Sequence, residues 1–227
     1  MTVPARTLGR LVAKQIIPLG VRYVRTPAGA KRYGVPIGSP IPLGRRAITP
    51  GAPRPPSQEW LRHSLDGATA AERDALRTYS SKRYREINGA LRGQTPMTPE
   101  IEDIVGNIDS ALQRHPLEGP VKLRRAVGPD EFRVPQPSEV FSKLGKAFVE
   151  QAYYSTSVDW DWPNRPIYLD VIVPAGVGLF ATYMAEVSKF PYQHEVLIQR
   201  GMSYRLDTIA YDEDAAVFRG QVTMRKS

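Results

Sequence analysis

Apolar residues recur every three or four positions in the second quarter of the chain, the spacing of helices that bury one face. The stretch 57–65, SQEWLRHSL, begins with a serine and an early acid that suit a helix N-terminus. Residues 68–93 predict one or two helices that Gly93 ends, and residues 98–114 predict another, capped by Thr98. This part of the chain is therefore expected to be helical.

Beyond Pro120 the pattern changes to the short β-branched and aromatic runs that are typical of strands. A short helix is predicted over 138–151, and strands are predicted over 121–127, 152–158, 166–174, 194–200, 203–212 and 215–225. Helices followed by strands favour an α+β domain over a doubly wound sheet, in which the two alternate. Neither a GxGxxG nor a GxxxxGK[ST] phosphate-binding motif is present.

Charge divides the chain into two parts. The formal net charge is +8, yet residues 1–56 hold ten Arg and Lys, no Asp or Glu, and ten of the 21 prolines. The remaining residues hold 21 basic and 23 acidic side chains. We therefore predict a basic Pro/Gly-rich leader over residues 1–56 and a folded domain over residues 57–227. The leader is either a flexible linker or an arm that docks on a nucleic acid, a capsid or portal, or another protein.

Several classes of protein are disfavoured by composition. The absence of cysteine excludes disulfides, cysteine nucleophiles and thiolate metal sites. His63, His115 and His194 are scattered without metal-ligand spacing, so no metal is expected. No apolar run approaches 18 residues and the N-terminus has no signal-peptide core, so neither a membrane span nor a secretory signal is expected.

Three polar features interrupt the predicted strands: Arg124-Arg125, Ser155-Thr156-Ser157 and Gln193-His194-Glu195. Each alone fits an exposed strand face. Glu195 is the least ordinary, because it opens the apolar run VLI, and an unpaired buried charge costs several kcal/mol. Gln193 lies two residues earlier and is expected on the same face of an extended chain.

Together these features resemble the R-S-E signature of bacterial exoenzyme-type mono-ADP-ribosyltransferases. The flanks resemble the family as well: YYSTS precedes YLDVIVPAGVGLFA, and Tyr79 to Arg92 reads Y-x4-Y-x-x-I-N-x-x-L-R. KLRRAVGPDEF is similar to a stretch of the enzymatic components of actin-modifying binary toxins. FPYQHEVLIQRG shows the Phe-x-x-Gln-x-Glu form of the clostridial Rho-modifying exoenzymes. The resemblance covers residues 57–225. A phage-encoded member of this family is one alternative that it leaves open.

The resemblance implies the ADP-ribosyltransferase fold, in which N-terminal helices pack on a two-sheet β core with an NAD cleft. NAD would be the co-substrate. Glu195 would stabilise the positive, oxocarbenium-like charge that develops on the ribose, and Ser155 would hold Glu195 in place. Arg124 would bind the NAD phosphates, with Arg125 as the second candidate. The other cofactor-binding residues implied are Tyr79, Tyr84, Asn88 and Arg92, together with Thr156 and Ser157, which would support the pocket.

The resemblance also bears on the acceptor. Arginine-modifying relatives carry a Glu where this chain has Gln193. An amide cannot act as a base, but it can donate to and accept from a carboxamide. An Asn-like side chain of a target protein is therefore expected as the acceptor rather than Arg, recognised by Gln193 and Phe190.

Two alternatives to protein modification remain open. One is an NAD glycohydrolase, in which water captures the ribosyl group. The other is a phage particle-associated protein, docked on a head or portal or injected, that carries the transferase domain. The protein is accordingly expected in the cytoplasm of the cell that makes it, or in a virion and then in a host cell.

Overall fold

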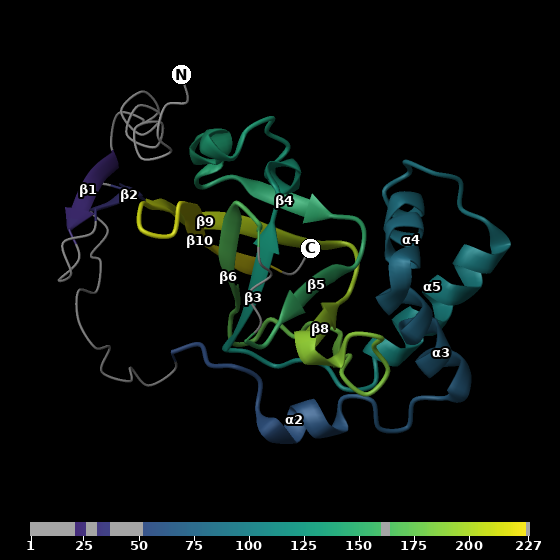
Figure 1. Ribbon diagram of the computed structural model, residues 1–227. Coiled ribbons are helices and arrows are strands. Elements are labelled where there is room, and N and C mark those ends of the chain that lie inside the picture. Colours follow the sequence, from purple (N-terminus) through teal and green to yellow (C-terminus); the bar gives the residue numbers. More distant parts are fainter. Residues whose placement is uncertain (1–20, 26–30, 37–51, 160–163, 226–227) are drawn as a thin grey trace.

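Helices come first in the domain and strands follow (Figure 1). The computed structural model describes residues 21–25, 31–36, 52–159 and 164–225. Its helices are α2 (Gln58–His63), α3 (Ala70–Thr78), the π-turn η1 (Tyr79–Arg83), α4 (Tyr84–Leu91) and α5 (Pro99–Leu112), with the short 3₁₀ turns η2 (Pro129–Phe132), η3 (Pro137–Lys143) and η4 (Pro191–Gln193). Its strands are β1 (Val21–Arg25), β2 (Lys31–Pro36), β3 (Val121–Val127), β4 (Ala147–Glu150), β5 (Tyr154–Ser157), β6 (Ile167–Val173), β7 (Ala181–Tyr183), β8 (Glu195–Ile198), β9 (Met202–Asp212) and β10 (Val217–Arg225). The α+β class is confirmed.

Capping side chains fix where the helices begin and end. Thr69 Oγ1 accepts from the Glu72 backbone N–H at 3.2 Å, and the Glu72 carboxylate accepts from the Thr69 N–H at 2.7 Å, a reciprocal capping box that starts α3. Thr98 caps α5 by accepting from the Ile101 N–H at 3.3 Å. Gly93, with a φ of 70°, ends the α4 segment, as its sequence position predicts.

The described strands form one open sheet in the order β1-β2-β9-β10-β6-β3-β5-β8-β7, with β4 paired to β9. All neighbours are antiparallel except β6 and β10. The ladder between β3 and β5 is a single register pair, Arg124 opposite Ser157. The two sheets expected from the sequence are therefore two blocks of one hydrogen-bonded sheet, because this pair joins them.

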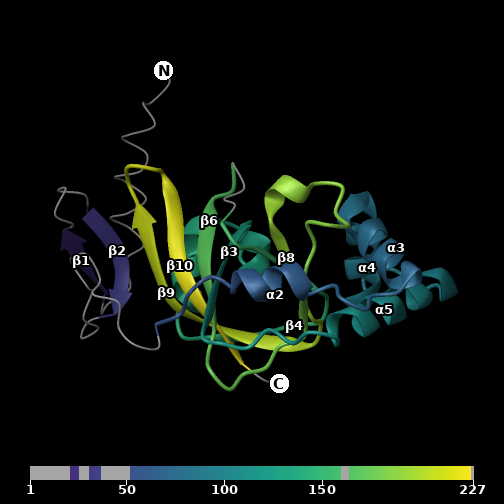
Figure 2. The same cartoon turned by 90° about the horizontal axis from the view of Figure 1, so that it is seen from below.

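Two apolar clusters hold the layers together. One lies among the strands and includes the fully buried Leu123 and Val171. The other packs Leu76 of α3 and Ile108 of α5 against Leu197 of β8. Figures 1 and 2 accordingly place the helices α3, α4 and α5 at the β8 end of the sheet, away from β1 and β2. β8 is buried on both faces, so its first residue stands at the edge of the core.

The single helix predicted over 138–151 is wrong. The segment forms the turn η3 and then the strand β4, which pairs antiparallel with β9. Gly145, with a φ of 75°, turns the chain between them, and its N–H donates to the Leu206 carbonyl at 2.8 Å. Strand β7 was not predicted, because its three residues follow a run of Pro and Gly and are too short to show alternation.

Two short strands lie in the segment expected to be a leader. β1 and β2 pair with each other, and β2 meets β9 where Arg32 lies opposite Asp212. The expected leader also includes residues 1–20, 26–30 and 37–51, which lie outside the described residues. Arg54 also contacts the domain, because its carbonyl accepts from the Lys122 N–H at 2.6 Å. In the described ranges no helix has the length and apolar character needed to cross a membrane.

Candidate functional site

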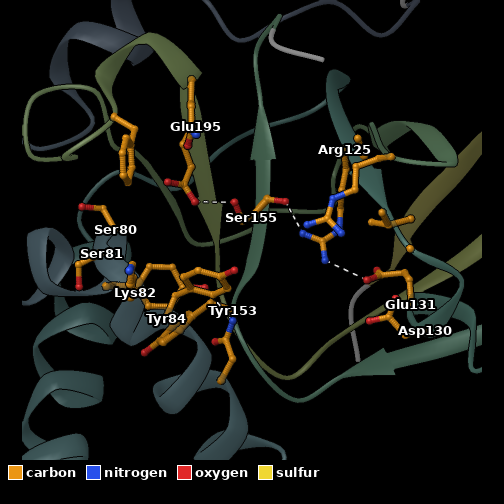
Figure 3. Close-up of a pocket in the computed structure, with 18 of the residues that line it drawn as sticks. Ser80, Ser81, Lys82, Tyr84, Arg125, Asp130, Glu131, Tyr153, Ser155 and Glu195 are labelled. Atoms are coloured by element: carbon orange, nitrogen blue, oxygen red, sulfur yellow. Dashed lines mark hydrogen bonds and ion pairs between the residues drawn. The ribbon is translucent and has the colours of Figure 1, made fainter. Parts of the chain in front are cut away.

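A cavity of about 550 Å³ lies where the π-turn η1 and the helix α4 face β3, β5 and β8 (Figure 3). Its wall includes nine of the residues expected at a site: Tyr79, Tyr84, Asn88, Arg92, Arg125, Ser155, Phe190, Gln193 and Glu195. The structure therefore brings most of these distant positions together. Three other expected residues, Arg124, Thr156 and Ser157, are not part of the wall.

Glu195 opens β8 with only 7% of its surface exposed. Ser155 on β5 donates from Oγ to Glu195 Oε1 at 2.5 Å (Figure 3). Burial raises the pKa of Glu195 above the ordinary carboxyl value, while the Ser155 hydrogen bond and the positive charge of Arg125 partly offset the rise. The carboxylate thus faces the cavity from a low-dielectric setting, in which a fixed charge acts strongly on a ligand.

The Arg125 guanidinium lies across the cavity from the Glu195 carboxylate (Figure 3). Its Nη1 donates to the Ser155 carbonyl at 2.5 Å, and its Nη2 donates to the Glu131 carboxylate at 2.9 Å. Its ζ carbon lies 4.0 Å from the centre of the Tyr154 ring, within cation–π range. Arg125 therefore links η2, β5 and, through Ser155, the Glu195 carboxylate.

Strand alternation places Arg124 and Arg125 on opposite faces of β3. Arg125 shares the face of the fully buried Leu123 and lines the cavity, whereas Arg124 Nη1 donates to the Asp159 carbonyl at 3.0 Å. Of the two arginines, Arg125 is therefore the one that the structure places on the cavity wall. The sequence carried the signal, because the apolar residues two positions before and after Arg125 mark the buried face.

Thr156 and Ser157 are fully buried behind the cavity wall. Thr156 Oγ1 donates to the Val196 carbonyl at 2.8 Å, and Ser157 Oγ donates to the Gln193 carbonyl at 2.7 Å. Both hydroxyls therefore bind β5 to the segment that carries Gln193 and Glu195. They support the cavity wall from behind, and neither is among the residues that line it.

Gln193 and Glu195 both line the cavity, but strand alternation is not the reason. Gln193 ends the turn η4, and His194 after it has a left-handed backbone with φ 45° and ψ 43°. This conformation is uncommon for any residue other than glycine. The backbone of His194 therefore sets the placement of the amide relative to the carboxylate.

A π-turn, η1, breaks the helical wall between α3 and α4. Ser81 within it has a non-helical ψ of −166°, and Ser80, Ser81 and Lys82 all line the cavity. Ser80 Oγ accepts from the Lys189 N–H at 3.1 Å, which ties the turn to the segment just before Phe190. π-turns inside helices occur frequently at functional sites.

Tyr79 and Asn88 form the buried part of the helical wall. Asn88 Nδ2 donates to Tyr79 Oη at 3.0 Å, and Asn88 Oδ1 is buried without a hydrogen bond from the described residues. Tyr84 is 39% exposed, and its ring centre lies 6.4 Å from that of Tyr79. A buried amide oxygen in this state is unusual in folded proteins, which fits a position beside a ligand.

Four cationic side chains line the cavity in different states. Arg92 is held by Glu150 through two hydrogen bonds of 3.0 and 2.9 Å, and Arg125 is held by Glu131. Within the described part of the chain, no ion pair holds Lys82 or Arg165, and both are exposed. The cavity therefore offers two fixed and two adaptable cations to an anionic ligand.

An adjoining cavity of about 400 Å³ shares Arg92, Asp130 and Glu131 with the first. Sequence reasoning did not place Glu131 in the site, although this residue is the buried partner of Arg125. An acid directly before the fully buried Phe132 was the available signal, but only the fold shows that it turns toward Arg125. Lys82, Arg165 and Tyr153 also line the cavity, and sequence reasoning missed them because none of them belongs to a polar run in a predicted strand.

Comparison with known proteins gives a consistent picture. Residues 54–225 match the profile of the family described as ADP-ribosyltransferase exoenzyme. No curated protein matches the chain. Among solved structures, an ADP-ribosyltransferase from Clostridium botulinum is 21% identical with a TM-score of 0.64, and the match covers 74% of this chain and 93% of that one.

Two further structures were determined with a dinucleotide. A protein from S. aureus, solved with NAD, is 17% identical with a TM-score of 0.64, over 78% of this chain and 99% of that one. The ADP-ribosylating toxin component of a C. perfringens binary enterotoxin, solved with NADH, is 25% identical with a TM-score of 0.64. This match covers 74% of the present chain but only 46% of the toxin component.

Proposed function

The chain belongs to the ADP-ribosyltransferase exoenzyme family, and we propose that it transfers ADP-ribose from NAD to an asparagine-like amide side chain of a protein. One observation carries the proposal: a buried carboxylate, Glu195, held by Ser155, shares a cavity with the amide of Gln193. The carboxylate suits cleavage of NAD, and the amide suits the choice of acceptor.

In the proposed reaction the bond between the ribose C1 and the nicotinamide nitrogen breaks, and its electron pair leaves with nicotinamide. Positive charge then builds up on the ribose, and the Glu195 carboxylate stabilises it more than the ground state. The acceptor amide nitrogen forms the new bond to C1 and releases a proton to solvent water. Glu195 must be ionised to act in this way.

The residues of the cavity fit NAD. The dinucleotide carries a diphosphate, and Arg125 with the exposed Lys82 and Arg165 provides cations for it. Asn88 Oδ1 and Arg125 Nε, both buried without hydrogen bonds within the described structure, supply a free acceptor and a free donor. We assign the phosphate-side role to Arg125 instead of Arg124, because Arg125 is the one that lines the cavity.

Gln193 and Phe190 are proposed to recognise the acceptor. Phe190 is 42% exposed beside the cavity, and Gln193 lines it from the adjacent turn. The Gln193 amide can pair with a carboxamide through one donated and one accepted hydrogen bond, whereas a guanidinium has no acceptor to offer it. An Asn-like side chain therefore matches this position better than Arg.

Incubation with adenylate-labelled NAD and a cell lysate tests the proposal. Label retained on a protein, stable to agents that cleave arginine adducts and mapped by mass spectrometry to an amide side chain, is the expected result. Glu195→Ala should abolish nicotinamide release and labelling together, whereas Gln193→Ala should lower labelling alone. Nicotinamide release without labelling of any protein would instead identify an NAD glycohydrolase.

For residues 1–56 we propose a docking role. Ten basic and no acidic side chains suit the phosphates of a nucleic acid or an acidic face of a capsid or portal. The full chain should bind DNA with an affinity that falls steeply with salt, and a chain starting at residue 54 should not. Equal binding by the two chains would contradict the proposal.

A further inference from the structure

Three consecutive residues, the last of β5 and the two that follow it, hold the turn that carries Gln193, and none of them lines the cavity. Ser157 Oγ donates to the Gln193 carbonyl at 2.7 Å, and the Val158 N–H donates to the His194 carbonyl at 3.1 Å. Asp159 Oδ1 lies 2.7 Å from His194 Nδ1. The first two contacts fix the backbone of the turn, and the third fixes the side chain of its left-handed residue.

His194 separates the two residues that the proposed reaction needs. A left-handed backbone costs a residue with a side chain about 1 to 2 kcal/mol, so it persists where its surroundings hold it. If His194 returned to an extended backbone, Gln193 would rotate relative to Glu195, because the two are joined through its dihedral angles. The contact between His194 and Asp159 is therefore in a position to decide where the Gln193 amide points.

Asp159 is itself anchored to the other block of the sheet. Its carbonyl accepts from Arg124 Nη1 at 3.0 Å, and Arg124 also forms the one register pair between β3 and β5, opposite Ser157. Arg124, Asp159 and His194 thus form a bracket of residues that are not among those lining the cavity. Arg124 does not line the cavity, and its role here is to anchor Asp159.

The bracket contributes little to global stability. The side chains of His194 and Asp159 are 44% and 62% exposed, and ion pairs at such exposure contribute about 0 to 1 kcal/mol. The nearby Tyr183 ring lies 6.4 Å from the imidazole and leaves it accessible. Loss of the bracket is therefore expected to change the geometry of the turn and not the stability of the domain.

We infer that Asp159 and His194 are positioning residues that hold the Gln193 amide toward the acceptor, so that they control transfer and leave NAD cleavage unchanged. The inference rests on the proposed function, since it concerns the acceptor step of that reaction. Ser155 and Arg125 hold Glu195 and its surroundings through separate contacts, so the cleaving carboxylate does not depend on the bracket.

The test compares Asp159→Ala with the wild type, using labelled NAD and a lysate protein that the wild type labels. Nicotinamide release without acceptor should keep its kcat and its KM for NAD within about twofold, while the ratio of transfer to release falls about tenfold or more, because small misplacements of a reacting group are costly. Asp159→Asn, whose amide oxygen still accepts from His194 Nδ1, should restore most of the ratio. His194→Gly, which adopts the same backbone without strain but lacks the ring, should lose it.

The matched control is Asp66→Ala. Asp66 forms a similar pair with His63, at 2.7 Å and with side-chain exposures of 57% and 60%, but neither residue lines the cavity. Its ratio of transfer to release should equal that of the wild type. A normal ratio in Asp159→Ala, a normal ratio in His194→Gly, an equal loss in Asp66→Ala, or a parallel fall in nicotinamide release would each overturn the inference.

Crystal structures of the wild type and Asp159→Ala separate the inference from the proposed function. In the variant the Gln193 side chain should leave the cavity while the hydrogen bond between Ser155 and Glu195 remains. An unmoved Gln193 refutes the bracket. A wild type that releases nicotinamide but labels no protein refutes the proposed transfer reaction. In that case the position of Gln193 in the two structures still tests whether Asp159 and His194 hold it.

Discussion

Glu195 meets two opposing demands at one residue. Its proposed role requires a charge in the cavity, but burial disfavours that charge and raises the pKa of the carboxyl group. A raised folded-state pKa contributes stability that is fully present below the unfolded-state pKa and is lost as the pH rises through the folded-state value. The ionised form of Glu195 is therefore a cost to the fold that function maintains.

Glu195→Gln should accordingly raise the melting temperature at neutral pH while lowering nicotinamide release by about 100-fold or more. The neutral amide keeps the shape of the side chain and can still accept from Ser155 Oγ, but it removes the buried charge. Thermal unfolding and nicotinamide release measure the two effects. The control is Glu118→Gln, an exposed position where neither should change. A lower melting temperature in Glu195→Gln would contradict the argument.

Ser155 sets the pH at which Glu195 ionises. Its hydrogen bond lowers the pKa of the carboxyl group against the effect of burial, so Ser155→Ala should raise that pKa further. The acid limb of kcat/KM for nicotinamide release should then move to higher pH, which a pH–rate profile measures. Ser157→Ala is the matched control, because its hydroxyl donates to the Gln193 carbonyl. The idea fails if the limb stays in place, or if it moves equally in both variants.

At the level of elements, the site depends on places where regular structure breaks. The π-turn η1 interrupts the helices, and the turn η4 with left-handed His194 interrupts the approach to β8. Ser80 joins the two breaks through its hydrogen bond from the Lys189 N–H. Regular helices and strands supply the rigid frame, and these two irregular segments carry cavity residues that a repeating backbone would turn elsewhere.

The start of α3 is the element whose stability responds most directly to acid. Arg114 donates to the Glu72 carboxylate and lowers the pKa of this group to about 2, with further hydrogen bonds from Ser110 and the Thr69 N–H, although burial opposes the shift. A lowered folded-state pKa contributes stability above the unfolded-state value of about 4.5, and this stability is lost as the pH falls toward 2.

Glu72→Gln should therefore destabilise the domain by about 2 kcal/mol at neutral pH. The substitution weakens the capping box and deprives Arg114 of its buried carboxylate partner. The difference from the wild type should shrink as the pH falls toward 2. Urea unfolding across this pH range measures it. Glu100→Gln, at a pair whose carboxylate is 68% exposed, should change stability little. A deficit in Glu72→Gln that does not vary with pH would count against the capping argument.

On the scale of the whole molecule, the cavity lies where two blocks of the sheet meet. The blocks β9-β10-β6-β3 and β5-β8-β7 meet at one register pair, Arg124 opposite Ser157. The second block carries Ser155 and Glu195, the first carries Arg125, and the helices close the remaining side (Figures 1 and 3). The site therefore requires the complete domain, because no single layer contains it.

Removal of residues 1–53 should leave this domain folded and active. The cut keeps Arg54, whose carbonyl accepts from the Lys122 N–H, and the family match begins at the same residue. Nicotinamide release should stay within about twofold of the full chain, since every cavity residue lies beyond the cut. A second cut, after residue 57, removes the Arg54 contact and the Ser57 cap of α2 and should lower the melting temperature. Loss of activity in the first cut would refute the proposed boundary.

The sequence by itself determined that helices precede strands in the domain, the helix ends at Ser57, Thr98 and Gly93, and three polar runs that each contribute a residue to the cavity wall. These features are local, since caps, periodicity and motif spacing are written within a few neighbouring residues. The alternation of β3 also marks Arg125 as the charged residue on the face of the buried Leu123 and Val127, a signal that the sequence already contains. Local patterns were sufficient for the α+β class, and together with the family resemblance they pointed to nine of the 19 residues that line the cavity.

Only the tertiary structure decided how those residues face one another. The pairing of Glu131 with Arg125, the single join between the two blocks, and the bracket from Arg124 through Asp159 to His194 all connect separate segments. Long-range contacts fix them, and a left-handed backbone at a histidine is adopted because its surroundings hold it, not because its sequence prefers it. The sequence therefore specified the chemistry of the site, and the packing of its two blocks specified the geometry.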